Sequence, residues 1–201
     1  TDERGQACGE RQVGEITLRG PSVMQGYYNN KSATEAVYKD GWLHTGDLGY
    51  LQDGALYVCG RVKDLIIISG KNYYPMDIEW TASNVEGVRK GNVIVFGVQE
   101  VGRSDERVVV CAETKADPAS YPDLEKKIKA RVREVLGIKI NDVVMLKPGS
   151  LPKTSSGKLQ RRLARKRYLS NELGVFRKGR GKIGLLKQLT RSQWQFFKYR
   201  K

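Results

Sequence analysis

Two glycine-containing segments place a charged side chain where a loop can present it to a ligand. Residues 45–47 read Thr-Gly-Asp and carry Asp47, and residues 155–158 read Ser-Ser-Gly-Lys and end in Lys158. A carboxylate can accept hydrogen bonds from two hydroxyl groups, and a lysine ammonium is a compact charge on a long stem that can reach a phosphate. Each pattern alone also fits a polar turn with a solvated side chain. Either segment by itself therefore favours a structural interpretation.

Other kinds of catalytic site are excluded or disfavoured by the sequence. The segment 155–158 is not a P-loop, because Leu159 stands where Ser or Thr should follow the lysine, and no glycine lies five residues before Gly157. His44 is the only histidine, which excludes a metal cluster built on histidines. No nucleophile-elbow pattern accompanies His44, so a Ser-His-Asp triad is disfavoured.

The cysteine pattern indicates free thiols. Cys8, Cys59 and Cys111 are an odd number of widely spaced residues without a paired CxxC motif, which favours a reducing cytoplasm over a disulfide framework or zinc site. No apolar run approaches the roughly 20 residues of a membrane span, and the first residues carry no signal-peptide core. We expect a cytoplasmic protein without a transmembrane segment.

Periodicity and turn signals predict an α+β chain. Ser32 is expected to cap the first helix with Glu35 in a capping box, and Asp53-Gly54 is expected to close a hairpin. Strands are predicted at 14–20, 50–51, 55–59, 65–68, 93–98, 107–112 and 143–146, and helices at 32–37, from Pro75 through Ala82, at 121–136 and at 160–173. The first part, to about Gly60, has too little helix to bury a full core alone, whereas 64–173 has the elements of a compact domain.

The junction between these parts is a charged segment. Residues 60–64 read Gly-Arg-Val-Lys-Asp and precede the apolar run 65–68, which predicts a buried strand. Such a charged cluster is a poor strand interior. We expect it to be a hinge between two domains.

Three segments together resemble one known family. Residues 42–47 (Trp-Leu-His-Thr-Gly-Asp), 60–64 and 152–158 (Pro-Lys-Thr-Ser-Ser-Gly-Lys), in this order and spacing, resemble the C-terminal part of the adenylate-forming superfamily. That superfamily includes acyl-CoA synthetases, fatty acyl-AMP ligases, luciferases and peptide-synthetase adenylation domains. The resemblance covers about 14–162. Residues 70–79, Gly-Lys-Asn-Tyr-Tyr-Pro-Met-Asp-Ile-Glu, look most like the fatty acyl-AMP ligase branch.

The resemblance implies a role for each matching residue. Asp47 would bind the ribose hydroxyls of ATP, and Arg61 would assist at the same ribose. Lys63, with Asp64, would form the hinge about which a small domain swings between adenylation and thioester formation. Lys158 would be the catalytic residue, reaching the α-phosphate and the substrate carboxylate.

The acceptor side of the reaction has weaker markers. The resemblance makes Ser69, Gly70 and Lys71 candidates for lining a tunnel for the acceptor thiol. Asn72 departs from the pattern of synthetases that use coenzyme A, which often carry Arg at this position. This departure slightly weakens the coenzyme A interpretation.

The resemblance also implies a domain organisation and cofactors. Residues 1–62 would be the β-rich end of a large adenylation domain, 63–173 a mobile C-terminal α+β lid with a small central sheet, and 174–201 a basic tail. ATP and Mg²⁺ would be used, but the phosphate loop and the magnesium-binding Glu have no counterpart in the 44 residues before Thr45. No metal site is expected in this chain, and we expect the chain alone to make no acyl-adenylate.

Two functions of different classes follow. The first is the C-terminal portion of a ligase that activates a carboxylic acid, chiefly a fatty acid, as acyl-AMP and passes it to an acyl carrier protein or to coenzyme A. The alternative is a catalytically inactive interaction module that keeps the fold. The joint presence of Asp47, Arg61, Lys63 and Lys158 favours the enzyme.

The basic tail leaves several interpretations open. Most of the net charge of +14 lies in 161–201, where Glu172 is the only acid. Residues 179–184 spell GxGxxG but lack a preceding strand and a following acid, which excludes a dinucleotide site. The aromatic and basic residues from 175 onward fit a carrier protein, a membrane surface, nucleic acid or packing on the large domain. A solvated extension is the favoured interpretation, and nucleic acid is disfavoured.

Overall fold

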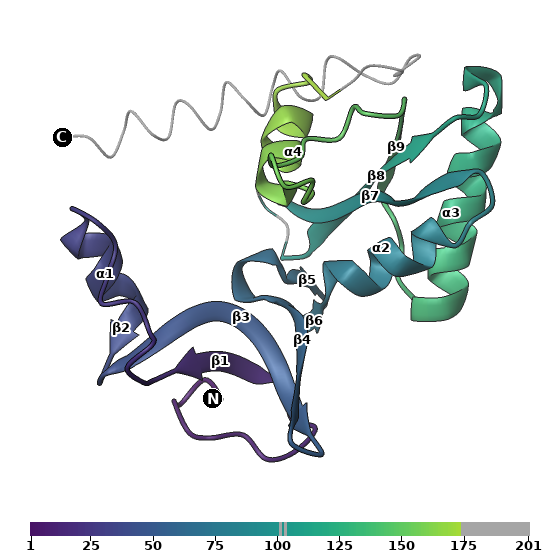
Figure 1. The fold of residues 1–201 in the computed structure, drawn as a ribbon. Coiled ribbons are helices and arrows are strands. Elements are labelled where there is room, and N and C mark those ends of the chain that lie inside the picture. The colour runs from purple at the N-terminus through teal and green to yellow at the C-terminus, as the bar shows by residue number, and fades with distance from the viewer. Residues whose placement is uncertain (101, 103, 174–201) are drawn as a thin grey trace.

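The computed structural model describes residues 1–100, 102 and 104–173. The tail from 174 onward, including the GxGxxG segment, lies outside the described residues. Helices and strands are mixed, as the sequence predicts. Figure 1 shows β1 to β4 together in the lower part of the view and the sheet β7–β9 with its helices in the upper part. The elements are β1 (Gly14–Leu18), α1 (Lys31–Val37), β2 (Tyr38–Lys39), β3 (Trp42–Gln52), β4 (Ala55–Arg61), η1 (Val62–Asp64), β5 (Ile66–Ile68), β6 (Lys71–Tyr73), α2 (Pro75–Ser83), β7 (Val88–Gln99), β8 (Glu106–Thr114), η2 (Pro118–Ser120), α3 (Tyr121–Leu136), β9 (Asp142–Leu146) and α4 (Arg161–Leu169).

The first sheet is built on the long strand β3. Strands β1, β2 and β4 all pair with β3 in antiparallel fashion. Gln52 pairs with Ala55 at the end of β3, so Asp53 and Gly54 form the two-residue turn that the sequence predicts. Both turn residues have positive φ, 50° and 75°, which a hairpin turn of this length requires. This hairpin brings the end of β4 back to the middle of β3.

The first helix begins differently from the prediction. Helix α1 starts at Lys31, and its N-cap is Asn30, whose side-chain oxygen accepts a hydrogen bond from the backbone of Ala33 at 3.1 Å. The expected Ser32 cap and Glu35 capping box are therefore wrong. Asparagine and serine are similarly good N-caps, and the sequence offers both within three residues.

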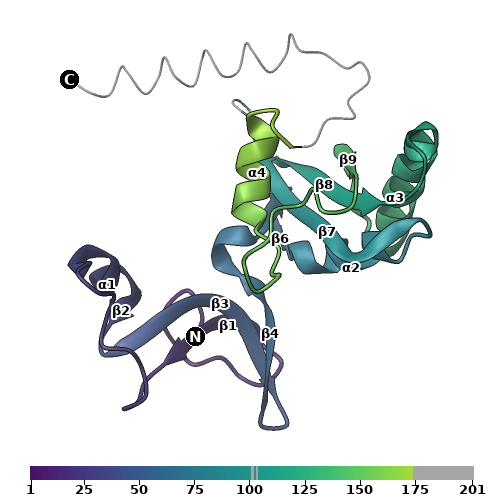
Figure 2. The same ribbon diagram turned by 45° about the horizontal axis from the view of Figure 1, so that its top comes forward.

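The second sheet has both faces covered. Strand β7 pairs antiparallel with β8, and β9 pairs parallel with β8. Alternate residues of these strands point to opposite faces. One set packs with α2 and α3, and the other packs with α4. Figure 2 shows α4 on one side of this sheet and α3 on the other. Burial on both faces explains the nearly continuous apolar runs of β7 and β8.

Local signals fix the ends of the helices around this sheet. Pro75 is the first residue of α2, as predicted. Helix α3 ends at Leu136, and Gly137 follows in the left-handed conformation with φ 68°. Helix α4 ends at Leu169, earlier than the predicted Leu173.

The apolar run 65–68 is not the buried strand that its composition suggests. Only Ile66 is fully buried, and Ile67 is 48% exposed. Residues Ile66–Ile68 form β5, which pairs with β6 in a two-stranded hairpin separate from the central sheet. A run of β-branched residues cannot by itself distinguish a central strand from a short hairpin with one buried side.

Candidate functional site

Asp47 lies at a bulge in strand β3. Glu15 of β1 pairs with Leu48 and Thr17 pairs with His44, so residues 45–47 bulge out opposite Ile16. Gly46 has φ 72°, a left-handed conformation that favours glycine. The Thr-Gly-Asp segment is therefore an irregularity within a strand rather than a loop between strands.

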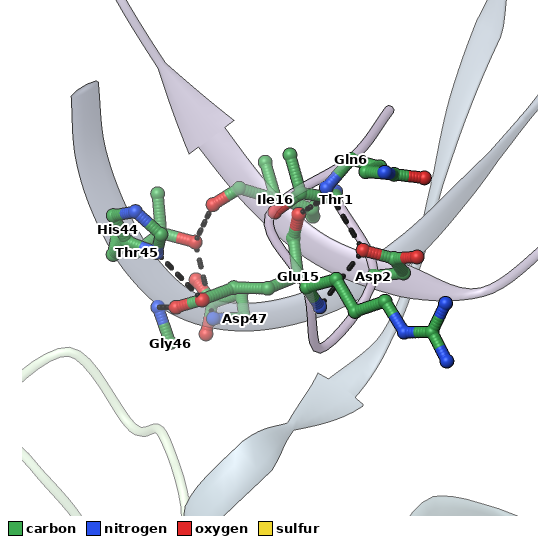
Figure 3. Close-up of polar contacts among 10 residues, drawn as sticks. Thr1, Asp2, Gln6, Glu15, Ile16, His44, Thr45, Gly46 and Asp47 are labelled. Carbon is green, nitrogen blue, oxygen red and sulfur yellow. Dashed lines mark hydrogen bonds and ion pairs between the residues drawn. The ribbon is translucent and has the colours of Figure 1, made fainter. Parts of the chain in front are cut away.

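Hydrogen bonds from β1 hold this bulge in place (Figure 3). Thr45 Oγ1 donates to the carbonyl of Ile16 at 2.7 Å and accepts from the Asp47 backbone at 3.1 Å. Glu15 Oε1 accepts from the Gly46 backbone at 3.0 Å. Its Oε2 lies 2.8 Å from His44 Nδ1, which donates because an ionised carboxylate only accepts. The bulge is thus positioned by side chains as well as by the sheet.

Glu15 is ionised in this arrangement. Burial alone would raise its pKa, but the hydrogen bonds from His44 and Gly46 and the nearby positive charges hold the pKa of Glu15 below its ordinary value. Sequence reasoning assigned no role to Glu15. The only local signal is its polar position in the alternating strand β1.

Asp47 and Arg61 form a cross-strand pair. They are register partners on β3 and β4, and Arg61 Nε donates to Asp47 Oδ1 at 2.8 Å. The side chains are 34% and 67% exposed, respectively. An exposed pair of this kind contributes little to stability. Because both side chains are exposed, a ligand can reach their charged groups.

The charged junction forms the short helix η1 directly after Arg61. Lys63 is exposed, whereas the side chain of Asp64 is only 14% exposed. Asp64 Oδ2 accepts from Arg161 Nη1 at 2.5 Å, although the two residues are 97 positions apart. Lys63 and Asp64 are neighbours in sequence but lie in very different surroundings.

Arg161 makes three contacts at the start of α4. Besides Asp64, it donates from Nη2 to Glu79 Oε1 at 2.8 Å and from Nε to the carbonyl of Val95 at 2.9 Å. Glu79 Oε1 also accepts from the Val95 backbone at 2.8 Å. Burial lowers and the two carboxylates raise the pKa of Arg161, with a net increase that keeps the guanidinium charged. The sequence alone assigned no role to Arg161.

Lys158 lies in a tight hairpin. An isolated bridge joins Lys153 to Leu159, and the backbone of Thr154 donates to the Lys158 carbonyl at 2.8 Å. Thr154 Oγ1 in turn accepts from the Lys158 backbone at 3.0 Å. The Lys158 side chain is exposed and has no hydrogen bond or ion pair within residues 1–100, 102 and 104–173. Hydrogen bonds therefore fix the backbone of Lys158, and its exposed ammonium group is accessible to a ligand.

Buried polar groups anchor the start of this hairpin. Glu113 is fully buried and accepts from the Leu151 backbone at 2.9 Å and from Arg89 Nη1 at 2.7 Å. Burial would raise its pKa, but the Leu151 and Gly149 amides and the Arg89 guanidinium hold the pKa of Glu113 below its ordinary value. These residues carry no motif, and a lone glutamate at the end of the apolar run of β8 is the only signal for them.

A second anchor holds the lysine that begins the hairpin. Lys153 Nζ donates to Asn92 Oδ1 at 2.7 Å. Thus the two lysines of the segment differ. The side chain of Lys153 is hydrogen-bonded to Asn92 of β7, whereas the side chain of Lys158 is exposed to solvent.

The candidate tunnel residues form the turn between β5 and β6. Ser69 and Gly70 both have positive φ, and Lys71 begins β6. Asp105 accepts from the Ser69 backbone at 2.6 Å and from its hydroxyl at 3.2 Å. Glu106 accepts from the Ile67 backbone at 3.0 Å. The turn is therefore fixed to the β7–β8 connection.

The predicted site residues fall into two groups. Asp47 and Arg61 are in direct contact, and η1 follows them. Lys158 lies beyond η1 in sequence and space, and no contact among the described residues links it with Asp47 or Arg61. In Figure 1, β3 lies in the lower part of the view and α4 in the upper part. The predicted site residues therefore lie on separate segments, Asp47 and Arg61 on β3 and β4 and Lys158 in the hairpin before α4.

Three further features of the described residues concern disulfides, metal binding and membrane spans. Cys8, Cys59 and Cys111 form no disulfide among the described residues, as their number predicts. Within the described ranges there is no group of three or more His, Cys, Asp or Glu side chains that could hold a metal ion. Among those same residues, none of the helices has the length and apolar character needed to cross a membrane.

Comparisons with known proteins identify the family of the chain. The family model of the Disco-interacting protein 2-like AMP domain matches residues 63–178. The chain is 43% identical over 163 residues to Rv1013 of Mycobacterium tuberculosis, named as a ligase, covering 80% of this chain and 30% of that protein. It is 35% identical over 178 residues to the medium-chain-fatty-acid acyl-carrier-protein ligase JamA of Moorena producens, with coverages of 83% and 30%.

A solved structure gives the same result. The chain matches a structure from studies of fatty acyl-adenylate ligases of E. coli and L. pneumophila with a TM-score of 0.70 and 39% identity, covering 83% of this chain and 30% of that one. The matching family model, relatives and fold therefore place the chain in the class of adenylate-forming proteins. The chain belongs to the AMP-domain family, and its relatives support the fatty acyl-AMP ligase branch. It spans about 30% of the length of the relatives that it matches.

Proposed function

We propose that the chain is the C-terminal part of an ATP-dependent ligase that activates a carboxylic acid, chiefly a fatty acid, as acyl-AMP. The substrate carboxylate attacks the α-phosphorus of ATP, and pyrophosphate leaves. A thiol then attacks the acyl carbonyl and AMP leaves, so that a thioester is the product. The observation that carries the proposal is the exposed side chain of Lys158, which has no partner among the described residues and lies in a hairpin anchored by Glu113 and Thr154.

Each predicted residue has a place in this reaction. Asp47 accepts from the ribose hydroxyls and Arg61 assists there, since both side chains are exposed and, among the described residues, their charges are paired with each other. Lys158 offsets the charge that develops between the α-phosphate and the carboxylate. Lys63 and Asp64 form the hinge that brings Lys158 to the ribose site, because contacts within the described chain do not already join them.

The proposed domain organisation follows the split site. Residues 1–62 form the β-rich end of a large domain, and 63–173 form a mobile lid. Exposed apolar side chains on β3 and β4 support the first assignment, since Leu51, Leu56 and Val58 are 49%, 51% and 58% exposed. Such a surface suits packing against further protein. Residues 174–201 form the basic tail, for which no contact is proposed.

The acceptor is proposed to be the pantetheine thiol of an acyl carrier protein, with coenzyme A as the alternative. The named substrate class of JamA supports the carrier protein, and Asn72 disfavours coenzyme A. The fixed turn at Ser69, Gly70 and Lys71 would line the approach of the thiol. Three free thiols suit a cytoplasmic enzyme.

Magnesium that accompanies ATP would be held outside the described residues. The described part of the chain has no cluster of acidic, histidine or cysteine side chains that fits a metal ion. The steps assigned to this chain are binding the ribose, neutralising charge at the α-phosphate and rotating the lid.

The test uses the full-length protein that contains this chain. Lys158→Ala should lower ATP–pyrophosphate exchange by about 100-fold or more, the usual loss when a group that stabilises developing charge is removed. Lys166→Ala is the matched control. Lys166 is also an exposed lysine but lies on α4, and its removal should keep the wild-type rate. An unchanged exchange rate in Lys158→Ala would contradict the proposed role.

The 201-residue chain alone should show no ATP–pyrophosphate exchange above background. Exchange by the purified chain would overturn the proposal that it is only part of the catalytic unit. If the full-length wild type is also inactive with a panel of fatty acids, the alternative of an inactive interaction module is favoured.

A further inference from the structure

We infer that Arg161 is a positioning residue that locks the hinge and the Lys158 hairpin into one rigid unit, so that the lid pivots only at Val62 and Lys63. This inference rests on the proposed function, adds Arg161 to it, and narrows the hinge: Asp64 stays fixed to the lid, and rotation takes place at Val62 and Lys63. Arg161, Asp64, Glu79 and the carbonyl of Val95 are called the Arg161 clasp below.

The clasp joins segments that are far apart in sequence. Arg161 uses all three of its guanidinium nitrogens, at 2.5 Å to Asp64, 2.8 Å to Glu79 and 2.9 Å to the Val95 carbonyl. These partners belong to η1, α2 and β7, and Arg161 itself begins α4. A planar guanidinium fixes the directions of its hydrogen bonds, which an ammonium does not.

The clasp is largely shielded from solvent. The side chains of Asp64, Glu79 and Arg161 are 14%, 17% and 24% exposed. Screening by water and salt is weak for such groups, so their geometry is more strongly fixed than that of surface ion pairs. The clasp can therefore hold η1 and the start of α4 in a fixed position relative to each other.

Anchors on both sides leave only two residues for the pivot. Arg61 is paired with Asp47 on β3, and Asp64 is held by the clasp. Val62 is 44% exposed, and Lys63 is exposed with no partner within the described residues. Backbone rotation is therefore confined to Val62 and Lys63, because moving Asp64 would break the clasp.

The clasp also reaches the catalytic lysine through a short connection. Arg161 follows Lys158 by three residues, and within that connection Leu159 bridges to Lys153 and Gln160 donates to the Pro152 carbonyl at 2.9 Å. When the lid rotates, the hinge end and Lys158 turn together. The turn at Ser69 is held separately by Asp105 and Glu106, so it does not depend on Arg161.

The two half-reactions of the full-length enzyme should therefore respond unequally to Arg161→Lys. Acyl-AMP formation, measured by ATP–pyrophosphate exchange, should fall at least tenfold more than thioester formation from supplied acyl-AMP, because a displaced Lys158 affects the first step. Arg165→Lys, at an exposed arginine of the same helix, is the matched control.

A purely structural role gives a different result. Loss of folded enzyme lowers both half-reactions by the same factor, and that outcome overturns the inference. Asp64→Ala should reproduce the unequal loss, and the double variant should lose no more than the worse single variant. Multiplied effects in the double variant would mean that the two residues act independently.

Hydrogen–deuterium exchange of the full-length protein decides the question without activity. Arg161→Lys should speed exchange in residues 62–66 and 158–161 together, while β8 keeps its protection. Unchanged exchange in 62–66 overturns the clasp. If the wild type makes no acyl-AMP, the proposed function fails, and the exchange measurement still tests whether Arg161 fixes the hinge.

Discussion

The exposed pair of Asp47 and Arg61 is placed by the sheet but contributes little to its stability. The two residues are opposite each other on β3 and β4, and the bulge at 45–47 turns the Asp47 carboxylate toward the end of β4. An ion pair this exposed typically stabilises a protein by no more than about 1 kcal/mol. If the pair binds the ribose, as we propose, its loss should affect ATP binding more than the stability of the fold.

Asp47→Asn in the full-length enzyme should raise the KM for ATP by about 10-fold or more, because a hydrogen bond to a charged group contributes roughly 1.5–3 kcal/mol. The free energy of unfolding should change by less than about 1 kcal/mol. Initial rates of pyrophosphate release against ATP concentration measure the first quantity, and denaturant unfolding measures the second.

The control for this change is Asp53→Asn in the β3–β4 turn. Asp53 has φ 50°, a conformation that asparagine adopts readily, and it lies away from the proposed ribose site. It should leave the KM for ATP unchanged. Equal KM values for Asp47→Asn and the wild type would remove Asp47 from the ATP site.

Individual residues were predictable only where they belong to a motif. Asp47, Arg61 and Lys158 stand at motif positions, and the fold gives each a setting that fits its proposed role. Glu15 and Glu113 were missed because their partners are about 30 to 40 positions away, as Gly46 is from Glu15 and Leu151 from Glu113. Local sequence carries no record of such contacts.

At the scale of elements, the hairpin that carries Lys158 depends on the buried carboxylate of Glu113. Glu113→Gln leaves Arg89 and two backbone amides with a neutral partner. Breaking a buried ion pair from one side typically costs about 3–5 kcal/mol. We expect a loss near the lower end of this range, because Arg89 is 41% exposed and can be solvated. Denaturant unfolding of the 201-residue chain measures it.

The matched control for this change is Glu125→Gln on α3. Glu125 forms an i,i+4 pair with Lys129 at 2.6 Å near the surface. Such pairs contribute about 0.2–0.5 kcal/mol, so the control should be nearly neutral. Similar losses in both variants would show that Glu113 has no special anchoring role.

The pH dependence of stability should follow from the same residue. The pKa of Glu113 is lower in the folded chain than its ordinary value of 4.5, so the unfolded chain binds more protons between these two values. Its stabilising contribution is complete above about pH 4.5 and is lost as pH falls through the folded pKa. Glu113→Gln should flatten the dependence of unfolding free energy on pH below 4.5, as measured by urea unfolding at several pH values. A wild-type slope in that range would contradict this assignment.

Elements were predictable where a local signal ends or begins them. Pro75, Gly137 and the Asp53-Gly54 turn all act through their own backbone preferences, and the structure places each as expected. The prediction for 65–68 was wrong because the partner strand, not the composition, decides whether a strand is central. The sequence likewise did not indicate that β9 would pair parallel to β8 across α3.

At the scale of the whole molecule, a very short connection joins the first sheet to the buried core around β7–β9. Strand β4 belongs to the first sheet, Ile66 belongs to the core around β7–β9, and η1 is all that lies between them apart from Leu65. The sequence predicted the position of this junction because charged residues interrupt two apolar runs. The Arg161 contact that limits the hinge could not be predicted, since it spans 97 positions.

Lys63→Pro tests whether this connection must turn. Proline fixes φ at residue 63 and restricts Val62, the preceding residue, to extended conformations, whereas Val62 begins η1 in this structure. In the full-length enzyme at least one of the two half-reactions should fall by about 10-fold or more, because a single lid pose cannot serve both. ATP–pyrophosphate exchange and thioester formation from supplied acyl-AMP measure the steps separately.

Lys63→Ala distinguishes backbone rotation from a role of the lysine charge. It removes the same exposed ammonium but leaves φ and ψ free, so it should retain far more activity than Lys63→Pro in the affected half-reaction. If Lys63→Pro slows neither half-reaction, the lid does not rotate at this residue. If both variants lose the same activity, the ammonium rather than the backbone is what the reaction needs, and the pivot must lie elsewhere in the connection.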